Sequence, residues 1–294
     1  MDVTGRSLPT AHMQSIAREF NFSETVFLQT RGAAECARVN IFTPVNEMDF
    51  AGHPIIGTGH VLFRQLLPKR PSSLSKAHDD SLVIETNAGD VAITYNREAQ
   101  VVSAQVPHNV HIHSQATPTR NILSTQPAIA GSNAVTALED TYPAVSVVKG
   151  VTYTLVDLTT LPEVFNMVAI GASPVTPLDA GWAPSFTGTM YYRASAPEVQ
   201  CGRKVQRLRV RMIAINLEDP ACGSGSCALG AFLALRDGAG HGKYTFHLDQ
   251  GSEMGRDSHI SVDIELDETG GKILSMTLSG QAAPVTEGVI LLPE

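Results

Sequence analysis

The sequence is short of positive charge and of long apolar runs, and each shortage excludes a class of protein. Lys and Arg number 21 against 29 Asp and Glu in 294 residues, which gives a net charge of −8. Binding to nucleic acid needs clustered Lys and Arg against phosphates, so we expect no nucleic-acid partner. No segment reaches the length of apolar sequence that a membrane-spanning helix requires, and residues 1–10 lack the apolar core of a secretion signal.

Cysteine is also scarce, and the four residues are scattered: Cys36, Cys201, Cys222 and Cys227. None forms a Cys-x-x-Cys pair, which argues against a zinc site and against a disulfide framework. The pattern favours free thiols in the reducing cytoplasm.

Motifs for metals and nucleotides are missing as well. A tract of three histidines, His108, His111 and His113, resembles a metal-binding sequence, but no acidic or cysteine residue lies nearby in the chain. The turn CGSGSC is neither the dinucleotide-binding GxGxxG nor a P-loop. We therefore expect no metal and no organic cofactor.

Hydrophobic periodicity predicts helices and strands in both halves of the chain. Helices are expected at Pro9–Phe20, Pro54–Leu67 and Cys227–Arg236. Strands are expected at Thr25–Gln29, Ala37–Phe42, Val101–Val106, Leu208–Ile215, Tyr244–Leu248, Ile260–Leu266 and Ile273–Leu278, with hairpins at Leu82–Tyr95 and Val145–Leu158. The polar segments Lys69–Asp80 and Pro107–Ser132 are expected to form a loop and a domain linker.

The two halves of the chain share a pattern. DFAGHPIIGTGHVLF and DPACGSGSCALGAFL both run from Asp through a turn of small residues into an apolar helix, so that Gly52 aligns with Gly223 and Gly59 with Gly230. Chance similarity between two glycine-rich turns is the alternative. We favour a pseudo-duplicated chain with one buried helix in each half. The two helix N-termini would supply free amides and a favourable dipole for a carboxylate.

Acidic and thiol side chains beside these turns could move protons, but each also has a structural interpretation. Glu24 could belong to an ordinary helix-to-strand connection, and His53 could cap its helix. Asp219 could begin a turn, and Cys222 could be a small buried filler. A thiol at a helix N-terminus has a lowered pKa, which keeps a reactive Cys222 open.

Three blocks, MQSIAREFNFSETVF, IFTPVNEMDFAGHPIIGT and EDPACGSGSCALGAFLA, resemble in this order the signature blocks of the PhzF-like family. That family is related to diaminopimelate epimerase and, more distantly, to proline racemase. The resemblance implies an α/β (α+β) fold of the diaminopimelate epimerase type, with two pseudo-symmetric domains that each wrap a curved, mostly antiparallel sheet around a central helix. The expected domains are residues 1–118 and 119–294, and a final strand at about 281–294 returns to the first.

The resemblance also implies roles for particular residues. Catalytic roles fall on Glu24, His53 and Asp219, and substrate-binding roles on Ser23, Gly52, Cys222, Gly223 and Ser224. Glu47, although it lies closer in sequence to the GHP turn than Glu24 does, is interpreted as structural.

Two features depart from the family. The sequence starts almost at the first helix, without the family's opening hairpin, so we expect an exposed or differently paired strand edge and an open wall of the site. Cys222 stands where many members have Thr. Ala51 occupies the place of the other thiol of a two-thiol racemase and excludes that mechanism, whereas a mixed Glu24 and Cys222 pair stays open.

The resemblance therefore predicts a cofactor-independent isomerase, active in secondary metabolism as a cytoplasmic homodimer. Its substrate would be a small carboxylate-bearing metabolite bound between the domains. Burial is expected to raise the pKa of Glu24 and so to suit it for proton transfer near neutral pH. A lyase, such as a dehydratase that uses the same proton abstraction, and a non-catalytic binding protein of this fold are the alternatives.

Overall fold

A computed structural model describes the protein except for residues 2, 4–7, 32–35, 67–79, 239–241 and 291–294. The loop expected at Lys69–Asp80 therefore lies outside the described residues, apart from Asp80. The last four residues of the expected closing strand lie outside them too.

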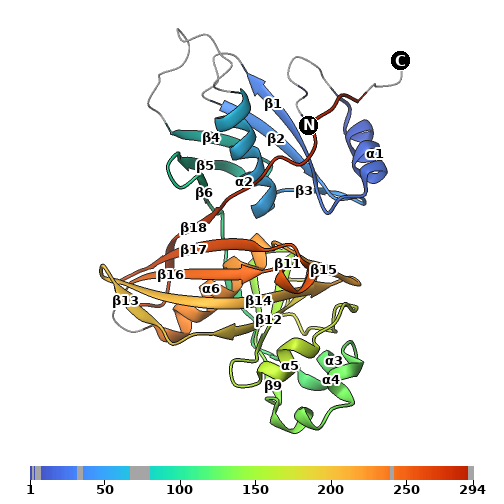
Figure 1. Ribbon diagram of the computed structural model, residues 1–294, viewed down its shortest axis with the longest axis vertical. Helices are drawn as coiled ribbons and strands as arrows, with labels where there is room; N and C mark the ends of the chain where they lie inside the picture. The colour runs from blue at the N-terminus through green and yellow to red at the C-terminus, as the bar shows by residue number, and fades with distance from the viewer. Residues whose placement is uncertain (2, 4–7, 32–35, 67–79, 239–241, 291–294) are drawn as a thin grey trace.

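The described chain forms two lobes, and each lobe wraps strands around one helix (Figure 1). The central helices are α2 (Gly52–Val61) and α6 (Gly223–Asp237). The first lobe also contains α1 (Thr10–Phe20), β1 (Thr25–Arg31), β2 (Cys36–Phe42), β3 (Glu47–Met48), β4 (Ser81–Thr86), β5 (Gly89–Asn96) and β6 (Val101–Gln105). As its periodicity predicts, α1 follows Pro9 and buries Met13 and Ala17.

The second lobe holds most of the remaining elements. Its strands are β7 (His111–Ile112), β8 (Thr117–Pro118), β9 (Thr141–Tyr142), β10 (Ala144–Val148), β11 (Val151–Asp157), β12 (Phe186–Ala194), β13 (Glu198–Gln200), β14 (Arg203–Ala214), β15 (Leu217–Asp219), β16 (Lys243–Gln250), β17 (Ser258–Leu266) and β18 (Ile273–Gly280). Its short helices are α3 (Thr119–Leu123), α4 (Pro127–Ala130) and α5 (Pro162–Met167), with 3-10 turns at Asn133–Ala137 and Ser252–Met254.

One mostly antiparallel sheet runs through both lobes in the order β1-β2-β4-β5-β6-β18-β17-β16-β14-β12-β11-β10-β7. Strand β18 joins the lobes, because it pairs with β6 on one side (Leu278 opposite Ala104) and with β17 on the other. The chain passes between the lobes after β6 and before β7. The expected fold class is confirmed, while the boundary at residue 118 stays a prediction.

Each central helix approaches its strands closely through a glycine. A Cβ on Gly59 would lie 2.7 Å from Val102 Cγ1, and one on Gly230 would lie 3.1 Å from Phe246 Cδ2. The two glycines that align in sequence therefore serve the same purpose in the two lobes, which explains why a helix interior retains them despite a cost of about 1 kcal/mol.

Several element boundaries differ from the expectation. Helix α2 begins at Gly52 and continues as a π-helical turn over Leu62–Leu66. Helix α6 begins at Gly223 rather than Cys227, because glycine-rich sequence is readily mistaken for a turn. Strand β12, at Phe186–Ala194, was not expected.

The expected linker at Pro107–Ser132 is wrong. The segment contains β7, β8, α3 and α4. It is anchored by Ile122 and Ile129, which are buried in a cluster with Phe165 of α5. The aliphatic residues of this segment are spaced too irregularly to give a periodic signal.

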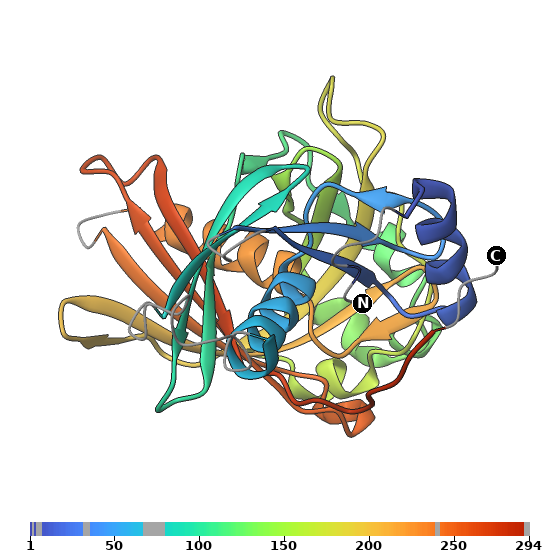
Figure 2. The same cartoon turned by 90° about the horizontal axis from the view of Figure 1, so that it is seen from above.

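The expected return of the chain end to the first lobe takes place without a strand. Residues 281–290 are extended but form no ladder, and Figures 1 and 2 show this red segment passing along α2 toward the N-terminus. It is held there by Arg64 Nη1, which donates to Ala282 O at 3.1 Å. The edge of β1 is met by Met1 and Val3, which exchange backbone hydrogen bonds with Leu28.

Candidate active site

The N-termini of the two central helices meet at the junction of the lobes. A Cβ on Gly52, the first residue of α2, would lie 3.4 Å from the Cα of Gly223, the first residue of α6, and 2.6 Å from Leu278 Cδ2. Only residues without a side chain allow this approach. First-turn amides have no partner within their own helix, so two sets of donors and two positive dipole ends converge here, an arrangement that can bind an anion.

Glu24 and His53 form a close pair beside this junction. Glu24 immediately precedes β1, and His53 is the second residue of α2. Their side chains approach to 2.9 Å between Glu24 Oε2 and His53 Nε2, with 16% and 37% of the two side chains exposed. The contact does not have hydrogen-bond alignment, and Oε2 has no other partner. An ion pair left with unused bonding capacity can accept a proton or donate one to a ligand.

The charges of this pair support each other. Burial would raise the pKa of Glu24, but the adjacent His53 and a hydrogen bond from Ser23 lower it further than burial raises it. Burial would likewise lower the pKa of His53, but Glu24 and Asp219 raise it above its ordinary value. The expectation of a raised Glu24 pKa is therefore wrong. Both shifts favour a carboxylate beside an imidazolium, that is, a base next to an acid.

Asp219 completes the group from the second lobe. It ends β15, and its Oδ1 accepts the Ala221 N–H at 2.8 Å. Burial raises the pKa of this carboxyl. Its charge acts on His53 across the junction, so the three expected catalytic residues are brought together.

Cys222 is not the exposed thiol that a helix N-terminus suggests. Only 4% of the residue is exposed, and its Sγ accepts the Gly225 N–H at 3.3 Å, as a helix-capping residue does. Burial, together with the nearby Asp219, raises the pKa of the thiol to about 12. The stabilising effect of the helix dipole is smaller than this cost, so Cys222 is a neutral cap.

Tyr153 lies behind the second helix terminus, and nothing in the sequence pointed to it. Its hydroxyl lies 2.7 Å from Ser224 Oγ and 3.3 Å from Cys222 Sγ. Burial raises the pKa of this phenol well above its ordinary value. Tyr153 is therefore neutral and fixes the Ser224 hydroxyl at the anion-binding turn.

Two cavities open at the junction, one on each side of α2. A cavity of about 410 Å³ lies between the lobes, lined from the first by His53 and Ile56 and from the second by Gly223 and Leu278. The other, of about 490 Å³, lies between α2 and β1 and is lined by Glu24 and His53. His53 lines both cavities, as do Arg64 and residues 282–284.

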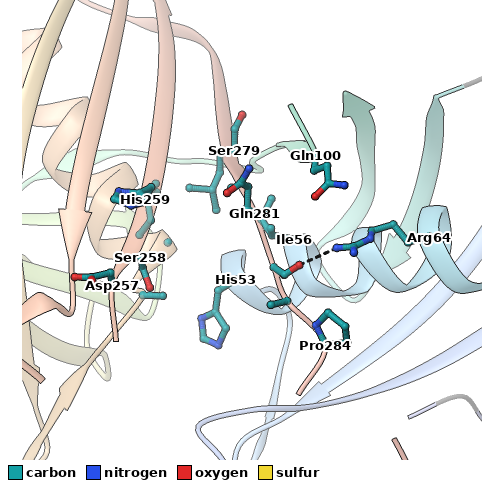
Figure 3. Close-up of a pocket in the computed structure, with 17 residues that line it drawn as sticks. His53, Ile56, Arg64, Gln100, Asp257, Ser258, His259, Ser279, Gln281 and Pro284 are labelled. Carbon is teal, nitrogen blue, oxygen red and sulfur yellow. Dashed lines mark hydrogen bonds between the residues drawn. The ribbon is translucent and has the colours of Figure 1, made fainter. Parts of the chain in front are cut away.

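The close-up shows lining residues that the sequence did not predict (Figure 3). Asp257, Ser258 and His259, at the start of β17, line the cavity across from α2, and Gln281 lies on the extended chain end. These side chains carry no local motif, since they come together only when β17 and β18 close the sheet against the first lobe.

The other expected residues are placed as follows. Ser23 is exposed and bonds to Glu24. Glu47 lines neither cavity. Its Oε1 accepts hydrogen bonds from Asn40 at 2.8 Å and Asn87 at 3.0 Å. This arrangement ties β2 to the β4–β5 turn and agrees with a structural role.

The chain has the diaminopimelate epimerase-like fold, and its relatives identify its class as isomerase. The model of the phenazine biosynthesis-like protein family matches residues 4–288. The chain belongs to this family. Within the described residues, none of the helices has the length and apolar character needed to cross a membrane.

Relatives and solved structures agree with this assignment. An uncharacterized isomerase of Mesorhizobium japonicum is 29% identical over 98% of this chain and 91% of its own length. The trans-2,3-dihydro-3-hydroxyanthranilate isomerase of Pseudomonas fluorescens is 41% identical over 103 residues, 34% of this chain and 32% of that enzyme. A phenazine biosynthesis protein of Bacillus anthracis has a TM-score of 0.66 at 20% identity and covers 97% of this chain and 90% of that one.

Proposed function

We propose that the protein isomerises a small carboxylate-bearing metabolite by moving a proton between two of its atoms, without a metal or organic cofactor. The observation that carries the proposal is the Glu24–His53 ion pair beside Asp219, at the point where two helix N-termini meet. The side chains themselves supply both a base and an acid, which is the equipment that a proton shift requires.

The substrate carboxylate would lie against the amides of the two helix termini, at Gly52 and Gly223, with the Ser224 hydroxyl beside it. Glu24, which is ionised, would remove a proton from carbon. His53, which carries a proton, would stabilise the charge that develops and return a proton elsewhere on the same molecule. Asp219 would hold His53 in its protonated form. One proton leaves and one returns, so the product has the composition of the substrate.

The family suggests the size and kind of substrate. The Pseudomonas fluorescens relative is named for trans-2,3-dihydro-3-hydroxyanthranilate, a small cyclic acid with amino and hydroxyl groups. We propose that a substrate of this class binds at His53, which lines both cavities. It would then reach Glu24 in the cavity of about 490 Å³ and the polar side chains of Asp257, Ser258 and Gln281 in the cavity of about 410 Å³. A cytoplasmic homodimer that serves secondary metabolism belongs to the same proposal and rests on the family resemblance. Light scattering would measure the oligomeric state.

The direct test is to incubate the protein with trans-2,3-dihydro-3-hydroxyanthranilate and with an analogue that lacks the carboxylate, and to follow both by NMR and mass spectrometry. The proposal predicts a product of unchanged mass from the acid and none from the analogue. Loss of water would show the dehydratase alternative instead. Failure of this acid and of a panel of related cyclic amino acids to react or to bind would contradict the proposal.

A further inference from the structure

Three polar side chains and one tryptophan gather in the second lobe, away from both cavities. His111 in β7 and His113 just after it meet Asp179 from the segment before β12, and the possible ligand atoms of all three lie within 4.8 Å of one another. Asp179 is the acidic partner that the histidine tract lacks in the sequence. Asp179 follows β10 and β11 in the chain, and the fold brings it next to the histidines.

The carboxylate of Asp179 is held in place before any ligand arrives. Its Oδ2 lies 2.7 Å from His111 Nε2. Ser114 donates to Oδ1 from its hydroxyl at 2.6 Å, and its backbone N–H lies within 3.2 Å of both carboxylate oxygens. Hydrogen bonds of this kind orient the carboxylates that bind metal ions.

His113 is fixed in one tautomer. Its side chain is fully buried. Its Nδ1 accepts the backbone N–H of Asp179 at 3.0 Å, so the ring proton resides on Nε2 and is donated to Ser146 Oγ at 2.9 Å. A histidine that donates one ring N–H to a fixed acceptor has the ring orientation found in metal ligands. Here the Nδ1 lone pair accepts the Asp179 N–H, which a metal ion would displace. His113 Nδ1 lies 3.9 Å from Asp179 Oδ2.

We propose that His111, His113 and Asp179 bind a divalent transition-metal ion, with Zn²⁺ as the natural occupant. The ligand atoms are His111 Nε2, His113 Nδ1 and Asp179 Oδ2. Two imidazoles and one carboxylate suit Zn²⁺, Co²⁺ and Ni²⁺, and three protein ligands leave a position for water. Binding at His111 Nε2 requires the neutral ring to carry its proton on Nδ1, and binding at His113 Nδ1 replaces the Asp179 N–H.

The role of this ion is to join segments, not to react. Neither ring nor the carboxylate lines a cavity of the active site. The ion would tie the chain that leaves β6 to the segment that leads into β12. Ligand exposures of 32% for His111 and 26% for Asp179 leave an entry path from solvent.

The fluorescence of the single tryptophan of the chain can report metal binding at this site. Trp182 stacks on His111 with ring centroids 4.4 Å apart and planes 9° from parallel. Titration of the intact, tag-free protein with cobalt(II) chloride should quench its fluorescence, saturably and with one ion per chain. Zinc chloride should restore the signal by competition, because Zn²⁺ has a filled d shell and does not quench.

Asp179→Asn is the most informative variant, because it keeps the stacked rings in place and removes only the charged ligand. Its apparent cobalt affinity should fall by at least about 10–100-fold, the loss typical even of a partner that only supports a ligand. His108→Ala removes a histidine of the same tract that does not belong to the cluster, and it should bind cobalt as wild type does.

The change in melting temperature on adding zinc is measured for each protein separately, so a folding defect in a variant does not affect the comparison. Zinc should raise the melting temperature of the wild type and of His108→Ala, but not that of Asp179→Asn. Quenching that does not saturate, quenching that zinc does not reverse, or equal affinity in Asp179→Asn and wild type would each overturn the proposal. Wild-type melting that does not respond to zinc would overturn it too.

Discussion

Glu24 Oε2 lies 2.9 Å from His53 Nε2, and the two side chains come from different elements that meet only in the folded first lobe. Burial alone would raise the pKa of Glu24 and lower that of His53. Their interaction outweighs burial, so the pKa of Glu24 is lowered and that of His53 is raised. Both shifts favour the charged forms, a base and an acid side by side.

The pair is expected to stabilise the fold over a limited pH range. The Glu24 pKa lies below its ordinary value of 4.5, so its contribution is present above pH 4.5 and is lost as the pH falls through the folded pKa. The His53 pKa lies above its ordinary value of 6.5, so its contribution is complete below pH 6.5 and is lost as the pH rises through the folded pKa. The difference in melting temperature between wild type and Glu24→Gln should peak between these values. A difference that stays constant from acid to alkaline pH would contradict the ion pair.

Asp219→Asn should lower the pKa of His53. The amide keeps the hydrogen bond from Ala221 but loses the charge that favours the imidazolium. NMR titration of the His53 ring measures this shift directly. Asp257→Asn is the control. Asp257 lines the same cavity as His53 but is not among the groups that shift the His53 pKa. Equal His53 titrations in the two variants would remove Asp219 from the catalytic group.

Iodoacetamide should label Cys201 in the native protein and leave Cys222 and Cys227 unmodified. Cys201 is exposed, whereas the other two are buried and their thiol pKa values are raised. Mass spectrometry after timed quenching gives the order of reaction. Labelling of Cys222 as fast as that of Cys201 would show that its thiol reaches the cavity and would reopen the mixed pair with Glu24.

Gly52→Ala should destabilise the junction between the helices. The new Cβ would lie 2.6 Å from Leu278 Cδ2, and overpacking of this kind costs about 1–3 kcal/mol. Adding Leu278→Ala to Gly52→Ala should cost less than the sum of the single changes, because the small side chain makes room. The control is Gly57→Ala in the same helix. It meets nothing within 4 Å and should stabilise the helix by about 0.5–1 kcal/mol. Denaturant unfolding compares the four variants, and an unaffected Gly52→Ala would contradict the close approach.

The helices and strands with clear periodicity were predictable, as was the similarity of the two halves. Gly59 and Gly230 occupy matching places against their sheets, and Gly52 meets Gly223, as their alignment suggested. These features are local, because spacing along the chain determines which residues share a helix face.

The features that the sequence did not reveal depend on residues far apart in the chain. The pKa of Glu24 depends on His53. Cys222 is buried where Tyr153 of β11 and Gln250 of β16 contact the start of α6. The cavity wall at Asp257–His259 forms only when β17 takes its place in the sheet. Asp179 joins the histidine tract through the fold alone.

The most direct test of the central claim is the entry of solvent deuterium into substrate. The wild-type protein, Glu24→Gln and Glu47→Gln are incubated in D₂O with trans-2,3-dihydro-3-hydroxyanthranilate, and deuterium on carbon is measured by mass spectrometry. We expect wild type and Glu47→Gln to incorporate the label at similar rates, and Glu24→Gln to be slower by about 10²–10⁴-fold with an unchanged circular dichroism spectrum. Incorporation by Glu24→Gln at more than a tenth of the wild-type rate, or its loss in Glu47→Gln alone, would show that Glu24 is not the proton-transfer group.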